Sequence, residues 1–157
     1  MPKRAGGTET ASTTVPLRPA LVVHSLEHVE AALAAAPEGA PALILVSAPG
    51  AGASLGPLFW QAMLRQARKA YPNARFTAYL DCADEAGTVL RALRAGVGHV
   101  RFIGRPEVAE RLAAIAEQLG AEITDEAFDT FDLLDQPDPF AACRAWLWRK
   151  HTLCGQD

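Results

Sequence analysis

Long apolar segments, excess basic charge and cysteine are all scarce in this chain. In its 157 residues no apolar run approaches the roughly 18 residues of a membrane-spanning helix. The net charge is −3 and the two signs are interspersed, so the basic surface typical of nucleic-acid-binding proteins is not expected. Cys82, Cys143 and Cys154 are odd in number and lack metal-ligand spacing. Reduced thiols in the cytoplasm are the simplest interpretation, and we expect contact with neither a membrane nor nucleic acid.

The start of the chain also lacks the apolar region of a signal peptide. Lys3 and Arg4 are followed by small polar residues instead. We therefore expect a disordered lead-in over residues 1–18 and an α/β domain over residues 19–124. Beyond it, residues 125–157 are predicted to form an acidic strap and an aromatic C-terminal helix.

Short apolar runs that alternate with segments of helical periodicity are the main positive signal. The runs cover residues 20–24, 42–46, 76–80 and 100–103. Residues 121–124 add a short fifth strand at most. Such alternation is typical of βαβ units around a parallel sheet. The predicted fold class is α/β, a three-layer open parallel sheet of four or five strands, with a C-terminal helical appendage.

A glycine-rich loop follows the second apolar run. In open parallel sheets ligands bind beyond the carboxyl ends of the strands, so this loop is a candidate ligand site. Gly50, Gly52 and Gly56 stand between a strand and a helix, where backbone amides and the helix dipole can hold a phosphate. Their spacing matches neither the dinucleotide fingerprint nor the P-loop. The alternative is a loop that simply needs small residues.

Asp81, Cys82 and Asp84 follow the third apolar run at the same expected edge. Two carboxylates and a thiol could serve acid–base catalysis or covalent attack. His24, at the end of the first run, is the histidine that could activate Cys82. Alternatively, Asp84 caps the next helix and Cys82 is a small buried residue. The histidines lack zinc-ligand spacing, so we expect no metal and no cofactor.

The last predicted helix, residues 140–151, is aromatic and basic. Trp146 and Trp148 are two positions apart, so their rings point to different sides of a helix. We expect Phe140, Trp146 and Trp148 to pack on this domain's own helices, on a second copy of the chain, or on a partner protein.

Four segments between residues 41 and 121 resemble the receiver domains of response regulators. Residues 41–50, PALILVSAPG, are similar to the receiver strand that carries the phosphoacceptor and its Pro-Gly loop. Residues 71–80, YPNARFTAYL, and 88–97, TVLRALRAGV, resemble the fourth strand and fourth helix, and Arg105-Pro106 falls where a Lys-Pro pair would be. The resemblance covers about half the chain. It implies a flavodoxin- or receiver-like fold and a regulatory module that acts through partners.

The residues of receiver phosphorylation are nevertheless replaced. Ser47 stands at the phosphoacceptor position, no lysine occurs at Ile103-Gly104-Arg105, and no acidic pair follows the first strand. We therefore predict a non-catalytic binding or regulatory module. The alternative is a small enzyme that acts on a phosphorylated or carbonyl metabolite at the carboxyl edge, and a third is half of a barrel-like assembly. Convergence of His24, Ser47, Asp81 and Arg105 on a pocket would favour the enzyme, whereas a filled edge would favour the binding module.

Overall fold

The computed structural model describes residues 15–154 and contains one parallel sheet of six strands. The first fourteen residues of the predicted lead-in lie outside the described residues. The strand order is β5-β4-β3-β2-β1-β6. The strands are β1 (Pro19–Val23), β2 (Leu43–Ser47), β3 (Phe76–Asp81), β4 (His99–Arg101), β5 (Glu122–Thr124) and β6 (Asp129–Asp132). The four strands and the short fifth expected from the sequence are present.

The prediction of four or five strands was wrong by one, because β6 lies in the acidic segment. It pairs in parallel with β1, with Asp129 opposite Pro19 and Asp132 opposite Val22. Within this segment Phe131 packs against the core and Leu133 is fully buried. Phe131 and Leu133 alternate with the exposed residues Thr130 and Asp132, which is the period of a half-buried strand. The many carboxylates of this segment obscured that pattern in the sequence.

Six helices connect or follow the strands. They are α1 (Leu26–Ala35), α2 (Ala51–Ser54), α3 (Pro57–Ala70), α4 (Ala86–Arg94), α5 (Pro106–Gln118) and α6 (Pro139–Cys154). Ser25 caps α1, as its side chain accepts a hydrogen bond from the backbone N–H of His28. The expected cap of α4 was misplaced by one residue, since Glu85 and not Asp84 precedes the helix.

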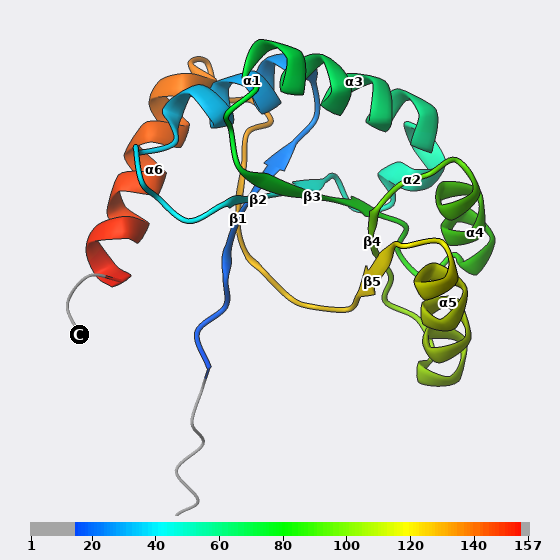
Figure 1. Cartoon of the computed structure of the whole chain (residues 1–157). Helices are drawn as coiled ribbons and strands as arrows, with labels where there is room; N and C mark the ends of the chain where they lie inside the picture. The colour runs from blue at the N-terminus through cyan, green and yellow to red at the C-terminus, as the bar shows by residue number, and fades with distance from the viewer. Residues whose placement is uncertain (1–14, 155–157) are drawn as a thin grey trace, which may run out of the picture.

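Helices α1, α3, α4 and α5 all lie on one face of the sheet, which curves away from them (Figure 1). From β1 to β5 the chain adds each strand on the same side of the previous one. Right-handed crossovers then place every helix on the same face. The predicted three-layer arrangement is therefore wrong, and so is the flavodoxin-like strand order 2-1-3-4-5, which requires a reversal of direction.

The other face of the sheet is crossed by the connection between β5 and β6 (Figure 1). Phe128 of this connection is buried against Ala20, Val46 and Tyr79, and its ring centroid lies 5.5 Å from that of Tyr79. This small apolar cluster is separate from the main core beneath the helices. A single aromatic side chain thus covers the centre of a face that a third layer would otherwise occupy.

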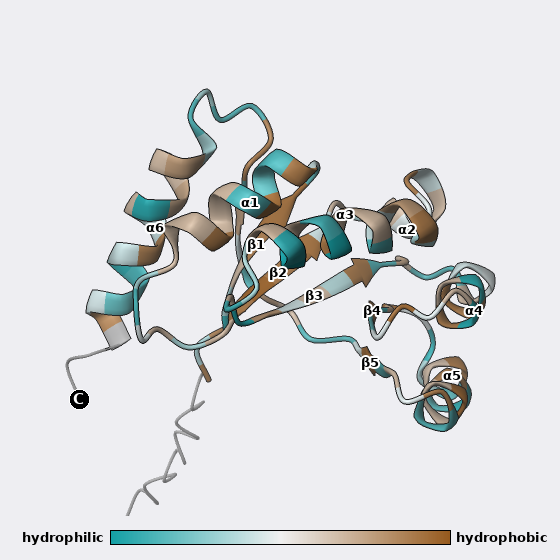
Figure 2. Ribbon diagram, turned by 45° about the horizontal axis from the view of Figure 1, so that its top comes forward, coloured by the Kyte–Doolittle hydropathy of each residue, from teal (hydrophilic) through white to brown (hydrophobic). Residues whose placement is uncertain are grey.

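Helix α6 extends the helical layer beyond α1 (Figure 1). Cys143 and Trp146 are buried in the main core, and the Trp146 ring stacks on Phe131 at a centroid distance of 5.8 Å. In Figure 2, β1 and β2 are predominantly brown, as expected for strands buried on both faces. Within residues 15–154, no helix is both long enough and apolar enough to span a membrane.

Candidate functional site

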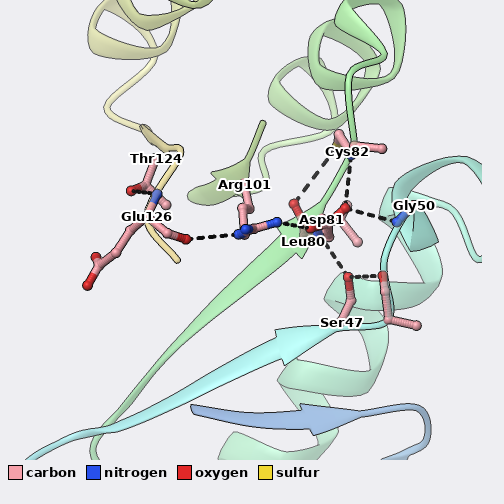
Figure 3. A network of polar contacts seen from close by, with 10 residues as sticks. Ser47, Gly50, Leu80, Asp81, Cys82, Arg101, Thr124 and Glu126 are labelled. Carbon is pink, nitrogen blue, oxygen red and sulfur yellow. Dashed lines mark hydrogen bonds and ion pairs between the residues drawn. The ribbon is translucent and has the colours of Figure 1, made fainter. Parts of the chain in front are cut away.

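Asp81 lies at the carboxyl end of β3 and forms the centre of the predicted edge site (Figure 3). Its side chain is only 5% exposed. Oδ1 accepts hydrogen bonds from the backbone N–H groups of Gly50 and Ala83, both at 2.9 Å. Oδ2 lies 2.8 Å from Nη1 of Arg101. Both oxygens are therefore already bonded within the protein, and the carboxylate links the loop after β2, the turn after β3 and strand β4. A carboxylate held in this way is poorly placed to act on a substrate.

Arg101 is the member of this cluster that the sequence interpretation missed. It lies on β4 directly opposite Asp81 in the parallel register, and its side chain is 20% exposed. Its Nε also donates a hydrogen bond to the backbone carbonyl of Glu126, at 2.9 Å. Opposite charges at the ends of two predicted neighbouring strands were the available signal. A buried carboxylate of this kind requires a paired cation.

Ser47, which occupies the phosphoacceptor position of the receiver resemblance, is also buried and hydrogen-bonded (Figure 3). Its hydroxyl oxygen accepts a hydrogen bond from the backbone N–H of Asp81 at 2.8 Å, and the hydroxyl donates to the carbonyl of Ala48 at 3.1 Å. The side chain therefore links the ends of β2 and β3.

The glycine-rich loop forms the four-residue helix α2 instead of an open cradle. Gly50 adopts φ +71° just before it, and its N–H is the donor to Asp81. Gly52 packs so closely on β3 that an added Cβ would lie 2.7 Å from Cys82 Sγ and 2.9 Å from Thr88 Cγ2. Packing and backbone geometry thus explain the small residues at these two positions. This agrees with the alternative interpretation, a loop that simply needs small residues.

Cys82 is 1% exposed, beneath that helix. Burial, with a smaller effect of the neighbouring carboxylates of Asp81 and Glu85, raises the pKa of its thiol to about 12. A nucleophilic cysteine needs an accessible thiolate, and this environment disfavours one. The expected histidine partner is engaged elsewhere, since Nε2 of His24 lies 2.6 Å from Oδ1 of Asp132 on β6.

The two remaining candidates face solvent. Asp84 is exposed in the turn before α4. Arg105, at the start of α5, has a side chain that is 78% exposed, and its ion-pair partner is Glu107, two residues further along the chain, at 3.5 Å. The structure therefore brings Ser47, Gly50, Asp81 and Cys82 together, with Gly52 against Cys82, and leaves His24, Asp84 and Arg105 outside this network. The candidate edge is filled by its own hydrogen bonds and packing.

A second candidate site is a surface groove between α6 and the end of α1. It has a volume of about 820 Å³ and is lined by Ala34, Ala35, Ala36, Pro37, Phe140, Ala141, Arg144, Ala145 and Trp148. Trp148 is 70% exposed and Phe140 is 41% exposed, whereas Trp146 is buried and unavailable for a partner. We call this surface the α1–α6 groove.

The charge around the α1–α6 groove has one sign on the side of α6. Among the described residues, Arg144 is the one charged residue in its lining, and Arg149 is exposed on the same helix. Helix α6 contains no acidic residue, although the exposed Asp138 directly precedes it. Lys150 is paired with Asp129 of β6. A lining of small residues, two aromatic side chains and Arg144 is suited to an apolar segment with acidic flanks.

Among residues 15–154, no group of three or more histidine, cysteine, aspartate or glutamate side chains could hold a metal ion. No protein-family model and no curated protein sequence matches the chain. The chain is an α/β domain with an open parallel sheet of six strands.

Proposed function

We propose that the protein is a non-catalytic binding module whose docking surface is the α1–α6 groove. The observation that carries this proposal is Trp148, a large aromatic side chain that is 70% exposed beside an alanine-lined groove. Tryptophan is enriched among the residues that dominate binding energy at protein interfaces. The filled carboxyl edge supports the same conclusion, because its carboxylate, hydroxyl and thiol are all engaged or buried.

The partner that fits best is an amphipathic helix with an apolar stripe and acidic flanks. Helices bind grooves of this kind through apolar residues at positions i, i+3, i+4 and i+7. Alanine side chains along the groove allow close approach of such a stripe. A symmetric dimer through α6 is less favourable, because it would bring Arg144 and Arg149 of two copies together without acidic residues on either helix.

The test uses two model peptides that form the same amphipathic helix from leucine and alanine. One carries glutamate on its flanks and the other carries lysine. Trp60 and Trp146 are buried, so a change in tryptophan emission or in acrylamide quenching reports mainly on Trp148. We expect the glutamate peptide to bind and to protect Trp148 from the quencher, and the lysine peptide to bind at least tenfold more weakly.

Two variants and a matched control complete this experiment. Trp148→Ala should weaken binding about 30-fold, measured by calorimetry because the fluorophore is lost. Arg144→Glu should reverse the preference between the two peptides, whereas Arg111→Glu, a charge reversal at another exposed position on the distant helix α5, should not (Figure 1). Equal binding of both peptides, or a concentration-dependent dimer that Trp148→Ala dissociates, would contradict the proposal in favour of non-specific adsorption or self-association.

A further inference from the structure

A separate pocket of about 480 Å³ lies at the amino ends of β1 and β2, opposite the edge where the sequence predicted a site. Its walls come from three segments that are distant in sequence. They are the start of β1, the connection from α1 into β2, and the C-terminal half of α6. In Figure 1 the connection from α1 (cyan) descends past α6 to the amino end of β2. Its volume lies within the roughly 300–1,000 Å³ of small-molecule pockets.

The interior of this pocket is apolar. Leu21, Leu43 and Trp146 belong to the buried core at its floor, and Leu147 and Pro41 also line it. Such walls favour a ligand with an apolar body, because they have few groups that could satisfy its polar atoms.

Among the residues that the structure describes, the charged side chains that line the pocket are all basic. They are Arg18 from the approach to β1 and Lys150 from α6, with His151 beside Lys150. Arg18 already forms a two-pronged ion pair with Glu126, with N–O distances of 2.7 and 2.6 Å. The Lys150 ammonium is bonded to Asp129 and lies 5.5 Å from the centre of the Trp146 ring. Lys150 thus has one carboxylate partner and an aromatic face beside it, at the boundary between the apolar floor and solvent.

We propose that this pocket binds an apolar molecule with a single carboxylate head, whose head is held by Lys150. The apolar body lies against Trp146 and Leu147. The carboxylate of the ligand either binds the Lys150 ammonium together with Asp129 or displaces Asp129 from it. A cationic head would lie beside the Arg18 guanidinium and the Lys150 ammonium, and a neutral head would leave Lys150 with Asp129 as its one charged partner. This site is distinct from the α1–α6 groove, although Pro37 lines both. Its contacts on α6 are Trp146, Leu147, Lys150 and His151, none of which lines the groove.

Decanoate, below its micellar concentration, is the probe. Binding is measured by isothermal titration calorimetry on the full chain, with decanol and decylamine as neutral and cationic counterparts. We expect saturable binding of decanoate, binding of decanol that is about fivefold weaker, and weaker binding still of decylamine. Filling the pocket with Ala42→Phe, at an exposed position on its wall, should reduce decanoate binding at least tenfold without lowering the melting temperature.

Two substitutions that break the same ion pair give the decisive comparison. Lys150→Gln removes the proposed receptor of the carboxylate and should weaken decanoate binding about fivefold. Asp129→Asn removes only the competing carboxylate and should tighten it about twofold or more. If the ion pair merely stabilises α6, both variants lower stability and change binding in the same direction.

Three calorimetric results would overturn the proposal. The first is equal affinity for decanoate and decanol. The second is a change in decanoate affinity in the same direction for Lys150→Gln and Asp129→Asn. The third is unchanged decanoate affinity in the Ala42→Phe variant. Vesicles that contain phosphatidylglycerol form a separate arm, because an anionic lipid surface has related chemistry. Co-sedimentation with these vesicles in place of decanoate binding would also overturn the proposal, in favour of a membrane surface.

Discussion

Replacement of Asp81 by alanine should destabilise the fold strongly, because this carboxylate is a structural connector. The substitution removes the acceptor of the Gly50 and Ala83 N–H groups and the ion-pair partner of Arg101. These donors belong to the loop after β2, the turn after β3 and strand β4. All three would lose an anchor at once.

The size of the effect follows from the burial of the pair. Removing one partner of a buried ion pair costs about 3–5 kcal/mol of unfolding free energy. Arg101 is 20% exposed and keeps its hydrogen bond to the Glu126 carbonyl, so the lower end of that range applies. A loss of about 3 kcal/mol corresponds to a decrease of roughly 6–12 °C in melting temperature for a domain of this size. Asp81→Asn retains an oxygen acceptor for the two N–H groups and should cost about half as much.

Urea unfolding followed by circular dichroism measures these differences. Asp84→Asn is the matched control, because Asp84 is exposed only three positions away, and it should change the unfolding free energy by no more than about 0.5 kcal/mol. A double-mutant cycle with Arg101→Met then isolates the pair. A cost below about 1 kcal/mol for Asp81→Ala, with Arg101 uncoupled from it, would refute the structural role and restore Asp81 as a candidate functional group.

Three further predictions concern side chains near the strand ends. Gly52→Ala should cost about 1–3 kcal/mol of unfolding free energy, since its Cβ would lie 2.7 Å from Cys82 Sγ, and Cys82→Ala should restore part of that loss in a thermal shift assay. With the other two cysteines replaced by serine, Cys82 should react with iodoacetamide far more slowly than a free thiol near pH 8, because its pKa is raised to about 12 by burial, and rapid native-state labelling would contradict this. Burial lowers the pKa of His28, whose Nδ1 accepts a hydrogen bond from the backbone N–H of His24. His28 of the unfolded chain therefore binds a proton more readily than His28 of the folded chain. The free energy of unfolding should be at its full value above about pH 6.5 and should decrease as the pH falls below it. His28→Gln should reduce the difference in urea midpoint between about pH 7 and pH 5.

The helices and the first strands were predictable because their signals are local. Apolar runs bounded by turn residues mark β1 to β4, and Ser25 marks the start of α1. These signals depend on residues within a few positions of one another. They do not depend on which strands become neighbours.

The layer arrangement was not predictable in this way, because it depends on strand order. The same strand–helix units can wind in one direction or reverse after the first unit, and only a reversal puts helices on both faces. Residues 125–132 determine where the sixth strand is added to the sheet. Their many acidic residues hide the apolar positions by which a strand is normally recognised in a sequence. Phe128 and Phe131 are the two positions in it that bury apolar side chains, one on each face of the sheet.

The carboxyl edge of the sheet was interpreted from an incomplete set of residues. The sequence placed Asp81 and Ser47 at neighbouring strand ends, and the structure has them in hydrogen-bond contact. What no local pattern contained was Arg101, whose position opposite Asp81 requires the register of β3 with β4. Its charge turns a candidate acid–base group into half of an ion pair.

The winding of the sheet also offers a reason why the carboxyl edge is closed. A crevice forms in an open parallel sheet where the connections after two adjacent strands leave toward opposite faces. Here the helices that follow β1 to β4 all lie on one face (Figure 1). The connections after β2 and β3 therefore leave side by side, close enough for the Gly50 amide to reach Asp81 and for Gly52 to contact Cys82. The two cavities described above lie where α6 meets α1 and at the amino ends of β1 and β2, the part of the molecule with the exposed Trp148 and the basic Lys150. Recognition by this chain is accordingly expected at α6, and substitutions there should alter binding while those at Asp81 alter stability.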